Sequence, residues 1–320
     1  MSFSGNVKEE LSNQWSAARH CQIAEIAGIM SMCGHISVNS RDNYAIKIHT
    51  ENIAVARKSF TLIKKTFNIR TEISVRRNPL KHSIVYSISI RKHEDAMRIL
   101  QATKLLGEKG DIFEELSIVR NVVVQETCCK RAFIRGAFLA VGSMSDPKKS
   151  YHFEIVCATM EHAVQLQTII NSFDMDAKIV CRKKSYVVYL KEGAQIVDIL
   201  NIMEAHVALM DLENVRILKE MRNTVNRKVN CETANIGKTV SAAVKQVEDI
   251  VYIRDHIGFE QLTEGLLDMA LLRLSYPEAT LKELGDLLTP SVGKSGVNHR
   301  LRKLSEMAEK ARKNKEVHYD

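Results

Sequence analysis

The feature that most constrains the fold of this 320-residue chain is an internal repeat. Residues 48–77 (IHTENIAVARKSFTLIKKTFNIRTEISVRR) are echoed by residues 156–184 (VCATMEHAVQLQTIINSFDMDAKIVCRKK). The aligned pairs lie 106 to 109 positions apart and are Thr50 with Thr159, Ala54 with Ala163, Phe67 with Phe173, Ile73 with Ile179 and Arg76 with Arg182. A repeat of this length predicts two copies of one structural unit.

An apolar segment with two glycines precedes each repeated stretch. The segments are IAGIMSMCG (26–34) and IRGAFLAVG (134–142), so that Gly28 and Gly34 correspond to Gly136 and Gly142. Glycine inside a helix is less favourable than alanine by about 1 kcal/mol, and its presence therefore needs a structural reason. Because glycine has no side chain to hold helices apart, we predict two helices whose backbones approach closely at Gly28 and Gly136.

Stretches of alternating polar and apolar residues follow each glycine helix and predict strands, giving each copy the order helix, two strands, helix, two strands, helix. The apolar residues assigned to the buried face are Ile46, Ile48, Ile73, Val75, Ile84, Tyr86, Ile88, Ile179 and Cys181. The opposite face carries the basic residues Lys47, His49, Arg76, Lys178, Arg182 and Lys191. Each sheet is therefore predicted to have one buried face and one basic face.

The periodicity after residue 240 is purely helical. One predicted helix is marked by Val240, Val244, Val247 and Val251, and a second by the leucines between 262 and 274. A third begins at the capping-box pattern Thr280-x-x-Glu283 and ends before Thr289-Pro290. After a short turn, a last helix has the apolar face Val297, Leu301, Leu304 and Ala308.

This last helix has the features of a DNA-recognition helix. A short helix, a tight turn and a second helix with a polar outer face form a helix-turn-helix, in which the start of the second helix enters the major groove. The predicted DNA-binding residues are Lys294, Ser295, Asn298, His299, Arg300, Arg302 and Lys303. Glu306 lies further along the outer side, where its charge would repel phosphate, so the base-reading part is expected to be short.

Charge is distributed unevenly along the chain, whose formal net charge is +8. Between Arg57 and Lys92 there are ten Lys or Arg and one acidic residue, and between Lys294 and Lys315 there are eight against two. The stretch 243–290 has nine acidic and four basic residues. The two basic zones indicate a polyanionic partner, with solvated charged faces as the alternative.

The seven cysteines include no C-x-x-C, and the eleven histidines show no metal-ligand spacing. We therefore predict buried, reduced thiols and no metal site, cofactor or small-molecule substrate. No run of 18 apolar residues occurs, and the first residues lack the pattern of a signal peptide, so we expect a soluble cytoplasmic protein.

The duplicated glycine helices resemble the helix pair of LAGLIDADG homing endonucleases. That resemblance implies a pseudo-twofold saddle of two sheets over DNA, with an acidic residue before the last glycine of each motif holding a catalytic metal. Here those positions are Cys33 and Val141. Neither offers the hard oxygen ligand that Mg²⁺ requires, so we expect no nuclease activity and no catalytic residues.

The segments ATLKELGDLLTPSVGKSGVNHRLRKLSEMAEKAR (279–312), NRKVNCETANIGKTV (226–240) and RGAFLAVGSMSDPKKSYHFEI (135–155) resemble the WhiA family of Gram-positive bacteria. This resemblance implies an α+β fold, in which a duplicated, degenerate LAGLIDADG-like αββαββα domain precedes an all-α helix-turn-helix domain. The expected boundaries are 1–222 for the duplicated domain (copies at about 20–106 and 128–222), 223–239 for a linker, 240–312 for the helix-turn-helix domain and 313–320 for a tail.

The function that the resemblance implies is that of a sequence-specific, nucleoid-associated transcription regulator linked to cell division, chromosome segregation or sporulation. Its partners would be double-stranded DNA and, as candidates, the transcription machinery or another regulator, with no membrane partner. Two alternatives stay open: an adaptor whose LAGLIDADG-like domain docks a protein, and a homing-type nuclease, which Cys33 and Val141 oppose.

Overall fold

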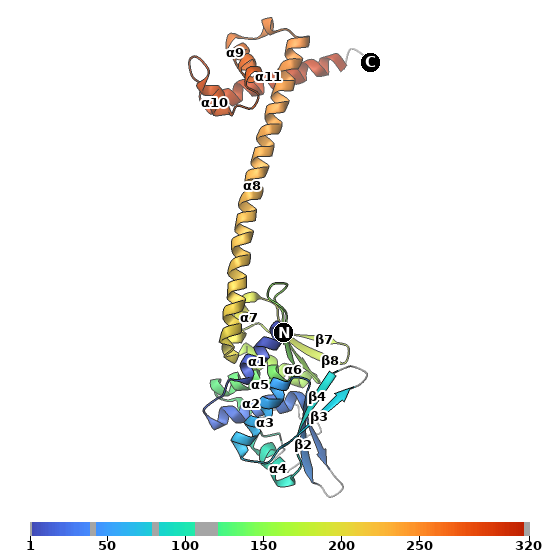
Figure 1. Ribbon diagram of the computed structural model, residues 1–320. Coiled ribbons are helices and arrows are strands. Elements are labelled where there is room, and N and C mark those ends of the chain that lie inside the picture. Colours follow the sequence, from blue (N-terminus) through green and yellow to red (C-terminus); the bar gives the residue numbers. More distant parts are fainter. Residues whose placement is uncertain (1, 39–42, 79–82, 106–120, 317–320) are drawn as a thin grey trace. The chain divides into compact units, whose positions relative to one another are not determined.

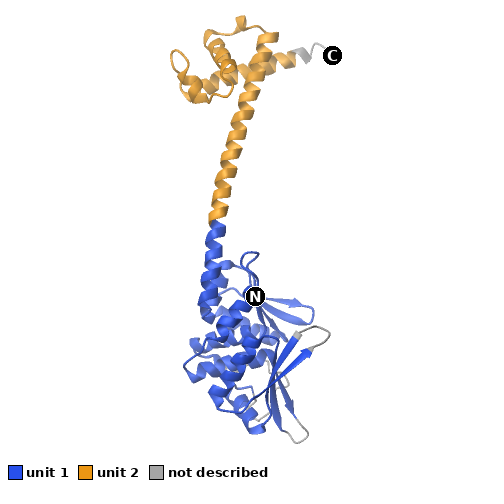
Figure 2. Ribbon diagram, in the orientation of Figure 1, with its two compact units in different colours: residues 1–220 blue, residues 221–320 orange. Residues whose placement is uncertain are grey.

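The computed structural model describes residues 2–38, 43–78, 83–105 and 121–316, and it divides into a first unit, residues 1–220, and a second unit, residues 221–320 (Figure 2). The first unit begins with α1 (Phe3–Ser12). Copy one then comprises α2 (Arg19–Cys33), β1 (Gly34–Val38), β2 (Tyr44–Thr50), α3 (Ile53–Phe67), β3 (Glu72–Asn78), β4 (Ser83–Ile90) and α4 (His93–Ala102).

Copy two repeats this order after a short 3-10 turn at Asn121–Val124. It comprises α5 (Thr127–Val141), β5 (Gly142–Met144), β6 (Phe153–Cys157), α6 (Met160–Asn171), β7 (Lys178–Arg182), β8 (Ser185–Leu190) and α7 (Gly193–Met203). The two sheets are antiparallel and have the equivalent strand orders β1-β2-β4-β3 and β5-β6-β8-β7. The predicted αββαββα duplication is confirmed.

The helices of the first unit lie on one side of the strands (Figure 1). At the centre, α2 and α5 pack against each other at the predicted glycines. A Cβ built on Gly28 would lie 2.4 Å from the carbonyl oxygen of Phe133, and one on Gly136 would lie 2.3 Å from that of Glu25. The contact therefore joins backbone to backbone, as the sequence predicts.

The predicted burial of one sheet face is correct only where helices cover it. Ile46, Ile48 and Ile88 are buried, whereas Ile73 is 47% and Val75 62% exposed, although β3 pairs in register with β4. Ile84 and Cys181 are also exposed. The prediction was wrong for these four residues because they lie on edge strands or toward hairpin ends, where the helices do not cover the sheet. Alternation along a strand shows which residues share a face, but not which part of that face is covered.

The second unit contains most of α8 (His206–His256), α9 (Glu264–Ser275), α10 (Leu281–Asp286) and α11 (Lys294–Glu316), with a 3-10 turn at Phe259–Gln261. Its core consists mainly of Ile250, Ile253, Leu266, Met269, Ala270, Leu284, Leu288, Val297, Leu301, Leu304 and Ala308. The predicted capping box is present, since Thr280 accepts from the Glu283 amide and the Glu283 carboxylate accepts from the Thr280 amide. The predicted apolar face of the last helix is buried.

The valines that predicted this helix lie only partly against the core, and Val247 and Val251 are half-buried. Val240 and Val244 are 55% and 52% exposed, and the helix instead buries Ile250 and Ile253. Helical periodicity identified the helix correctly but cannot decide which face a partner covers. Residues 223–239, expected to form a linker, are helical throughout and exposed. Among the described helices, none combines the length and apolar character that a membrane crossing requires.

Candidate nucleic-acid interface

The arrangement of α10 and α11 depends on one glycine. Val292 donates its amide to the Gly285 carbonyl at 3.0 Å, which closes the turn onto α10. A Cβ on Gly285 would lie 2.1 Å from the carbonyl oxygen of Val292, so the turn admits no side chain there. Together with the capping box at the start of α10, this contact sets the position at which α11 begins, at Lys294.

The first three turns of α11 have sharply different faces. Val297, Leu301 and Leu304 are buried in the core of the second unit. The exposed side chains on the other side are Lys294, Ser295, Asn298, His299, Arg302 and Lys303. They combine amide, imidazole, hydroxyl and cationic groups, the types that contact base edges and phosphates in a major groove.

Two arginines of the predicted set have partners within the domain. Arg300 is half-buried and donates to the carbonyl of Gly265 at 3.3 Å, so in this conformation it ties α11 to the start of α9. Arg302 pairs with Glu306 at 3.0 Å, one turn along the same face. Both partners of that pair are well exposed, and pairs of this kind contribute only about 0.3–0.5 kcal/mol. Arg302 can therefore exchange Glu306 for a DNA group, whereas Arg300 is better placed to support the helix.

Buried polar contacts hold α11 on α8. Arg312 donates to the buried carboxylate of Asp249 at 2.7 Å and lies over the Tyr252 ring at 4.6 Å. The buried Arg273 of α9 donates to Gln246 of α8 and to the carbonyl of Ala279 before α10. These bonds connect α9 and α11 to α8, and Arg273 also holds the segment that precedes α10. The contacts of Arg273 could not be predicted from the sequence, because two of its acceptors are the backbone oxygens of Pro277 and Ala279.

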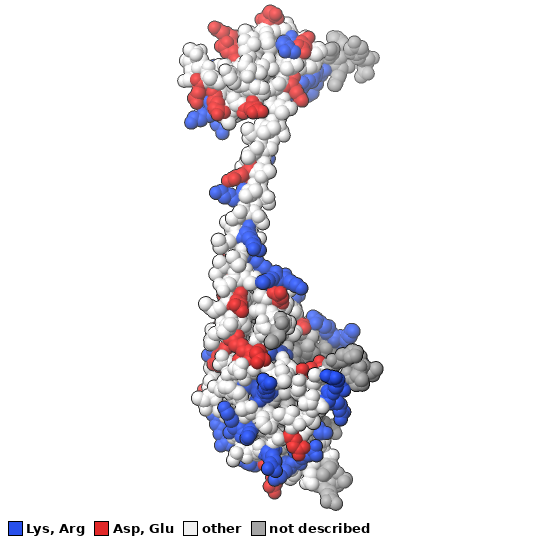
Figure 3. Space-filling view, in the orientation of Figure 1, with Lys and Arg blue, Asp and Glu red and all other residues white. Residues whose placement is uncertain are grey.

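The basic sheet face predicted for copy one is present. Lys47, His49 and Arg76 are exposed on the face opposite the buried Ile46 and Ile48. Within the described ranges, no carboxylate pairs with Lys47 or Arg76. Burial, followed by the charges of His35, Lys47 and Arg76, lowers the pKa of His49, so its imidazole is neutral at pH 7. Figure 3 shows Lys and Arg side chains on the side of the first unit where the strands lie, and also over its helices.

The corresponding face of copy two is less basic. Arg182, the register equivalent of Arg76, pairs with Glu154 at 3.1 Å, and Lys178 pairs with Asp176 at 3.4 Å. Lys191 is exposed and lies over the ring of Tyr189. The strand register aligns Glu154 with Lys47 of copy one, so the two copies carry opposite charges at this position.

The next row of side chains differs even more. In copy one it is His49, Ser87 and Ser74, and in copy two it is Val156, Val187 and Val180. The two outer faces are therefore equivalent in shape but not in chemistry. Alternation along each strand correctly predicted which side of the sheet carries the basic residues. It could not predict this difference between the copies, because the rows are known only once β2 is paired with β4 and β6 with β8.

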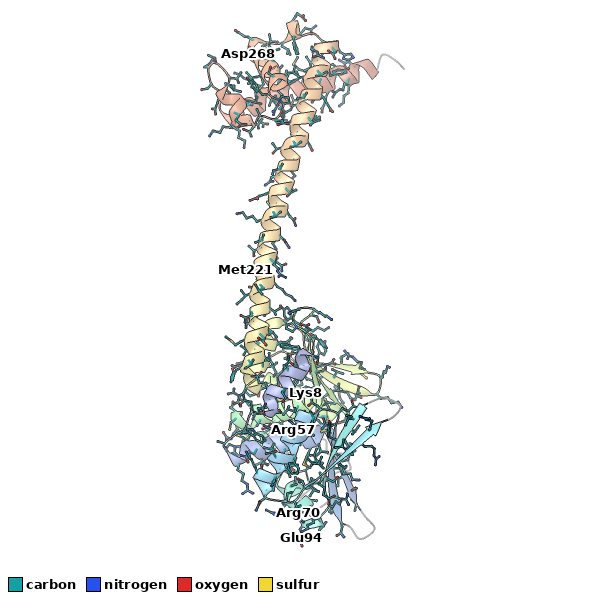
Figure 4. The ribbon with its side chains drawn as sticks, in the orientation of Figure 1. Lys8, Arg57, Arg70, Glu94, Met221 and Asp268 are labelled. Atoms are coloured by element: carbon teal, nitrogen blue, oxygen red, sulfur yellow. The ribbon has the colours of Figure 1, made fainter. Side chains whose placement is uncertain are left out.

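The positions at which the LAGLIDADG resemblance implies a metal lie at the ends of α2 and α5. The thiol of Cys33 donates to the carbonyl of Ile29 at 3.3 Å, and burial raises its pKa to about 12. Burial lowers the pKa of Lys8, labelled on α1 in Figure 4, to about 8, and the nearby Cys33 opposes this effect. The site thus contains a neutral thiol, an apolar side chain and a half-buried ammonium group.

A buried ionic network, which sequence analysis missed, lies beside the glycine contact. Glu25 of α2 pairs with Arg135 of α5 and with Lys58 of α3, each at 3.2 Å. Arg135 also pairs with Glu204 at 2.6 Å and donates to the Ser16 hydroxyl at 2.7 Å. Glu25, Lys58 and Arg135 are almost completely buried, and they join both copies across the helix pair. The isolated charges Glu25 and Arg135 inside otherwise apolar helices were the available signal.

Three family models match the chain in sequence order. They are the WhiA N-terminal LAGLIDADG-like domain over residues 19–106, the WhiA LAGLIDADG-like domain over 130–222 and the WhiA C-terminal HTH domain over 225–308. A probable cell division protein WhiA from Lachnoclostridium phytofermentans is 59% identical over 310 residues, covering 97% of this chain and 99% of that protein. One from Alkaliphilus oremlandii is 50% identical, covering 98% and 99%.

The fold is also found in solved structures. The crystal structure of full-length DUF199/WhiA from Thermatoga maritima has a TM-score of 0.60 and 24% identity, covering 97% of this chain and 99% of that one. The crystal structure of the N-terminal LAGLIDADG domain of DUF199/WhiA has a TM-score of 0.50 and 22% identity, covering 63% and 90%. With two LAGLIDADG-like copies, a C-terminal helix-turn-helix and relatives matched over nearly their whole length, the chain belongs to the WhiA family.

Proposed function

We propose that this protein is a sequence-specific DNA-binding transcription regulator that inserts the start of α11 into the major groove. The observation that carries the proposal is the division of α11 into a buried face and an exposed polar face in its first three turns. Asn298 and Arg302 would contact base edges, while Lys294 and Lys303 would contact phosphates. The names of its relatives favour genes of cell division as targets. Chromosome segregation and sporulation belong to the proposal only as processes that the family resemblance implies.

In the same proposal the protein has no nuclease activity and associates with the nucleoid through DNA. The side chains at the LAGLIDADG metal positions, Cys33 and Val141, offer no carboxylate, and the half-buried ammonium group of Lys8 lies near Cys33. An ammonium group would repel a divalent cation, and a neutral thiol is a poor ligand for Mg²⁺. Cleavage of plasmid DNA in Mg²⁺ or Mn²⁺ by the purified chain, abolished by a substitution near Cys33, would overturn this part of the proposal.

The binding proposal is tested by fluorescence anisotropy of labelled duplex DNA at several salt concentrations. Replacing Lys303 with alanine should weaken binding to all sequences and lower the salt slope by about one, because one phosphate contact is lost. Lys238→Ala is the matched control, since it removes the same charge from an exposed position in the middle of α8. Equal affinities and salt slopes for wild type and a folded Lys303→Ala variant would contradict the proposal.

The outer face of copy one is proposed as a second, weaker DNA contact. Lys47 and Arg76 are exposed there, and within the described residues they have no acidic partner, which leaves their charges available to phosphate. In copy two, Arg182 is already paired with Glu154. The two faces should therefore contribute unequally, although the helix-pair symmetry places Arg76 and Arg182 equivalently.

Charge reversal separates these contributions. At about 50 mM salt, where phosphate contacts are least screened, Arg76→Glu together with Arg182→Glu should reduce the affinity of the full chain several-fold. Arg76→Glu alone should account for most of the loss, and Arg182→Glu alone for little. If the double variant binds DNA like wild type, the sheet faces are not DNA contacts.

A protein-docking role for copy two is the second candidate function. It is favoured by Val156 and Val180, exposed on the outer face where copy one has polar side chains. Another regulator or the transcription machinery would be the partner. Val156→Thr with Val180→Thr should then leave DNA affinity unchanged while weakening recruitment of RNA polymerase to a bound promoter, and unchanged recruitment would contradict this role.

A further inference from the structure

A cluster of sulfur and nitrogen donors lies where the first turns of α2 and α5 meet. His20 and Cys21 come from α2, and Cys128 and Cys129 from α5. The two pairs are separated by 108 positions, the offset that also relates Gly28 to Gly136. The pseudo-twofold packing of the helices therefore brings equivalent positions of the two copies together, at the opposite end of the helix pair from Cys33 and Val141.

The donor atoms in this cluster are close enough to one another to share one ion. The four donor atoms all lie within 4.8 Å of one another. His20 Nδ1 is 3.1 Å from Cys129 Sγ and 3.4 Å from Cys21 Sγ. In a tetrahedral zinc site, with Zn–S near 2.3 Å and Zn–N near 2.0 Å, neighbouring ligand atoms are about 3.5–3.8 Å apart. The four donor atoms are therefore near the spacing that one tetrahedral zinc ion requires.

We propose that His20, Cys21, Cys128 and Cys129 bind one structural Zn²⁺ that joins the two copies of the LAGLIDADG-like domain. Three thiolates and one imidazole are a donor set that selects zinc over Mg²⁺ or Ca²⁺. Four protein ligands close the coordination sphere and leave no position for a reacting water, so the role is structural. The site is independent of DNA binding and of the degenerate metal positions.

The N-termini of α2 and α5 would stabilise the negative charge of such a zinc complex. Zn²⁺ bound by three thiolates and a neutral imidazole carries a net charge of −1, and each helix N-terminus is equivalent to about +0.5. Neither Ala18 nor Glu126, the N-cap residues of α2 and α5, supplies a side-chain cap. No N-cap side chain competes for the first-turn amides of either helix, so these amides can donate to the thiolates.

Zinc binding releases the thiol protons of the three cysteines. A free cysteine thiol has a pKa of about 8.5 and binds zinc only as the thiolate. As the three Zn–S bonds form, three thiol protons pass to solvent. Because bound metal stabilises only the thiolate form, its affinity should fall steeply with decreasing pH.

The first test measures metal content. The full chain is purified under reducing conditions, treated with a chelator, reconstituted with zinc and analysed by mass spectrometry of the metal. We expect one zinc per chain in the wild type and in Cys181→Ser, a control at an exposed cysteine outside the cluster. Cys128→Ser, which changes an exposed ligand, should weaken zinc binding at least tenfold. Substoichiometric zinc in the wild type, or unchanged affinity in Cys128→Ser, overturns the proposal.

The second test needs no variant and so does not depend on folding of a mutant. Zinc should slow alkylation of Cys128 at least tenfold in the native chain, while the exposed Cys181 and Cys231 react equally with and without metal. Replacing zinc by Co²⁺ should give the visible spectrum of a tetrahedral thiolate complex. Equal reactivity of Cys128 in both states, or a Cys21–Cys129 disulfide in place of bound metal under reductant, would overturn the proposal.

Discussion

Replacing Gly28 with alanine tests the close packing on which the first unit depends. The new Cβ would lie 2.4 Å from the carbonyl oxygen of Phe133 and 3.1 Å from the amide nitrogen of Ala137, whereas ordinary contacts begin at 3.4 Å. Both neighbours are backbone atoms, so no side chain can rotate to make room. The helices α2 and α5 would have to separate locally by about 1 Å, a gap that removes a quarter to a half of the dispersion energy of each affected contact.

Two opposing effects determine the magnitude. Alanine is a better helix former than glycine by about 1 kcal/mol. Overpacking a tight interface costs about 1–3 kcal/mol, and more where backbone must move, and the buried Glu25–Arg135 pair crosses the same interface. We expect a net destabilisation of about 2 kcal/mol. For a unit of about 200 residues this lowers the melting temperature by about 4–8 °C.

Differential scanning calorimetry of the full chain measures the effect on the transition of the first unit. The control is Gly237→Ala in the middle of α8, where nothing lies within 4 Å of the new Cβ. That substitution should bring only the helix-propensity gain of about 1 kcal/mol. If Gly28→Ala melts at or above the wild-type temperature, the glycines do not mediate a close helix contact and the account of the duplicated unit fails.

Three further predictions concern charged groups. Arg135→Met should destabilise the first unit by about 3 kcal/mol in urea unfolding, because it leaves Glu25 buried with fewer partners; a loss below about 1 kcal/mol would mean that the network is not buried as described. Lys8→Met should stabilise the chain by about 2 kcal/mol at pH 7, since a pKa lowered from 10.5 to about 8 means that the unfolded chain binds the proton more tightly. The wild type loses stability as the pH falls from 10.5 to 8, so the difference in free energy of unfolding between variant and wild type should disappear above pH 10.5. A difference that does not change with pH would show that the Lys8 charge is not its cause. Glu306→Gln should raise DNA affinity about two- to threefold at low salt and less at high salt, because it frees Arg302 and removes a charge that repels phosphate; weaker binding in an anisotropy titration would show that the ion pair positions Arg302.

The sequence predicted those features that repeat or have a fixed period. The offset between Gly28 and Gly136 indicated the helix pair, and the spacing of Val297, Leu301, Leu304 and Ala308 indicated the buried face of α11. In each case the pattern reports a contact within one element or between equivalent elements. The structure added the acceptor of Arg300, the Gly265 carbonyl, because a backbone acceptor leaves no mark on the sequence.

Contacts between elements that lie far apart in the chain could not be predicted from the sequence. The donors His20 and Cys129 are 109 positions apart, so a search for ligand spacing along the chain did not find them, although the repeat offset could have aligned them. Val240 and Ile250 belong to the same helix and have similar side chains, yet only Ile250 is buried. Which of the two is covered depends on where α9 and α11 pack, a property of the tertiary fold.

The central claim, that α11 reads DNA sequence, is tested most directly by selecting duplexes from a random pool with the full chain and its Arg302→Ala variant. The wild type should enrich one defined sequence, and Arg302→Ala should lose preference at a single base pair, as expected when a contact that provides about 1–3 kcal/mol of discrimination is removed. Enrichment of no sequence by the wild type, or the same sequence preference in a folded Arg302→Ala variant, would contradict the claim.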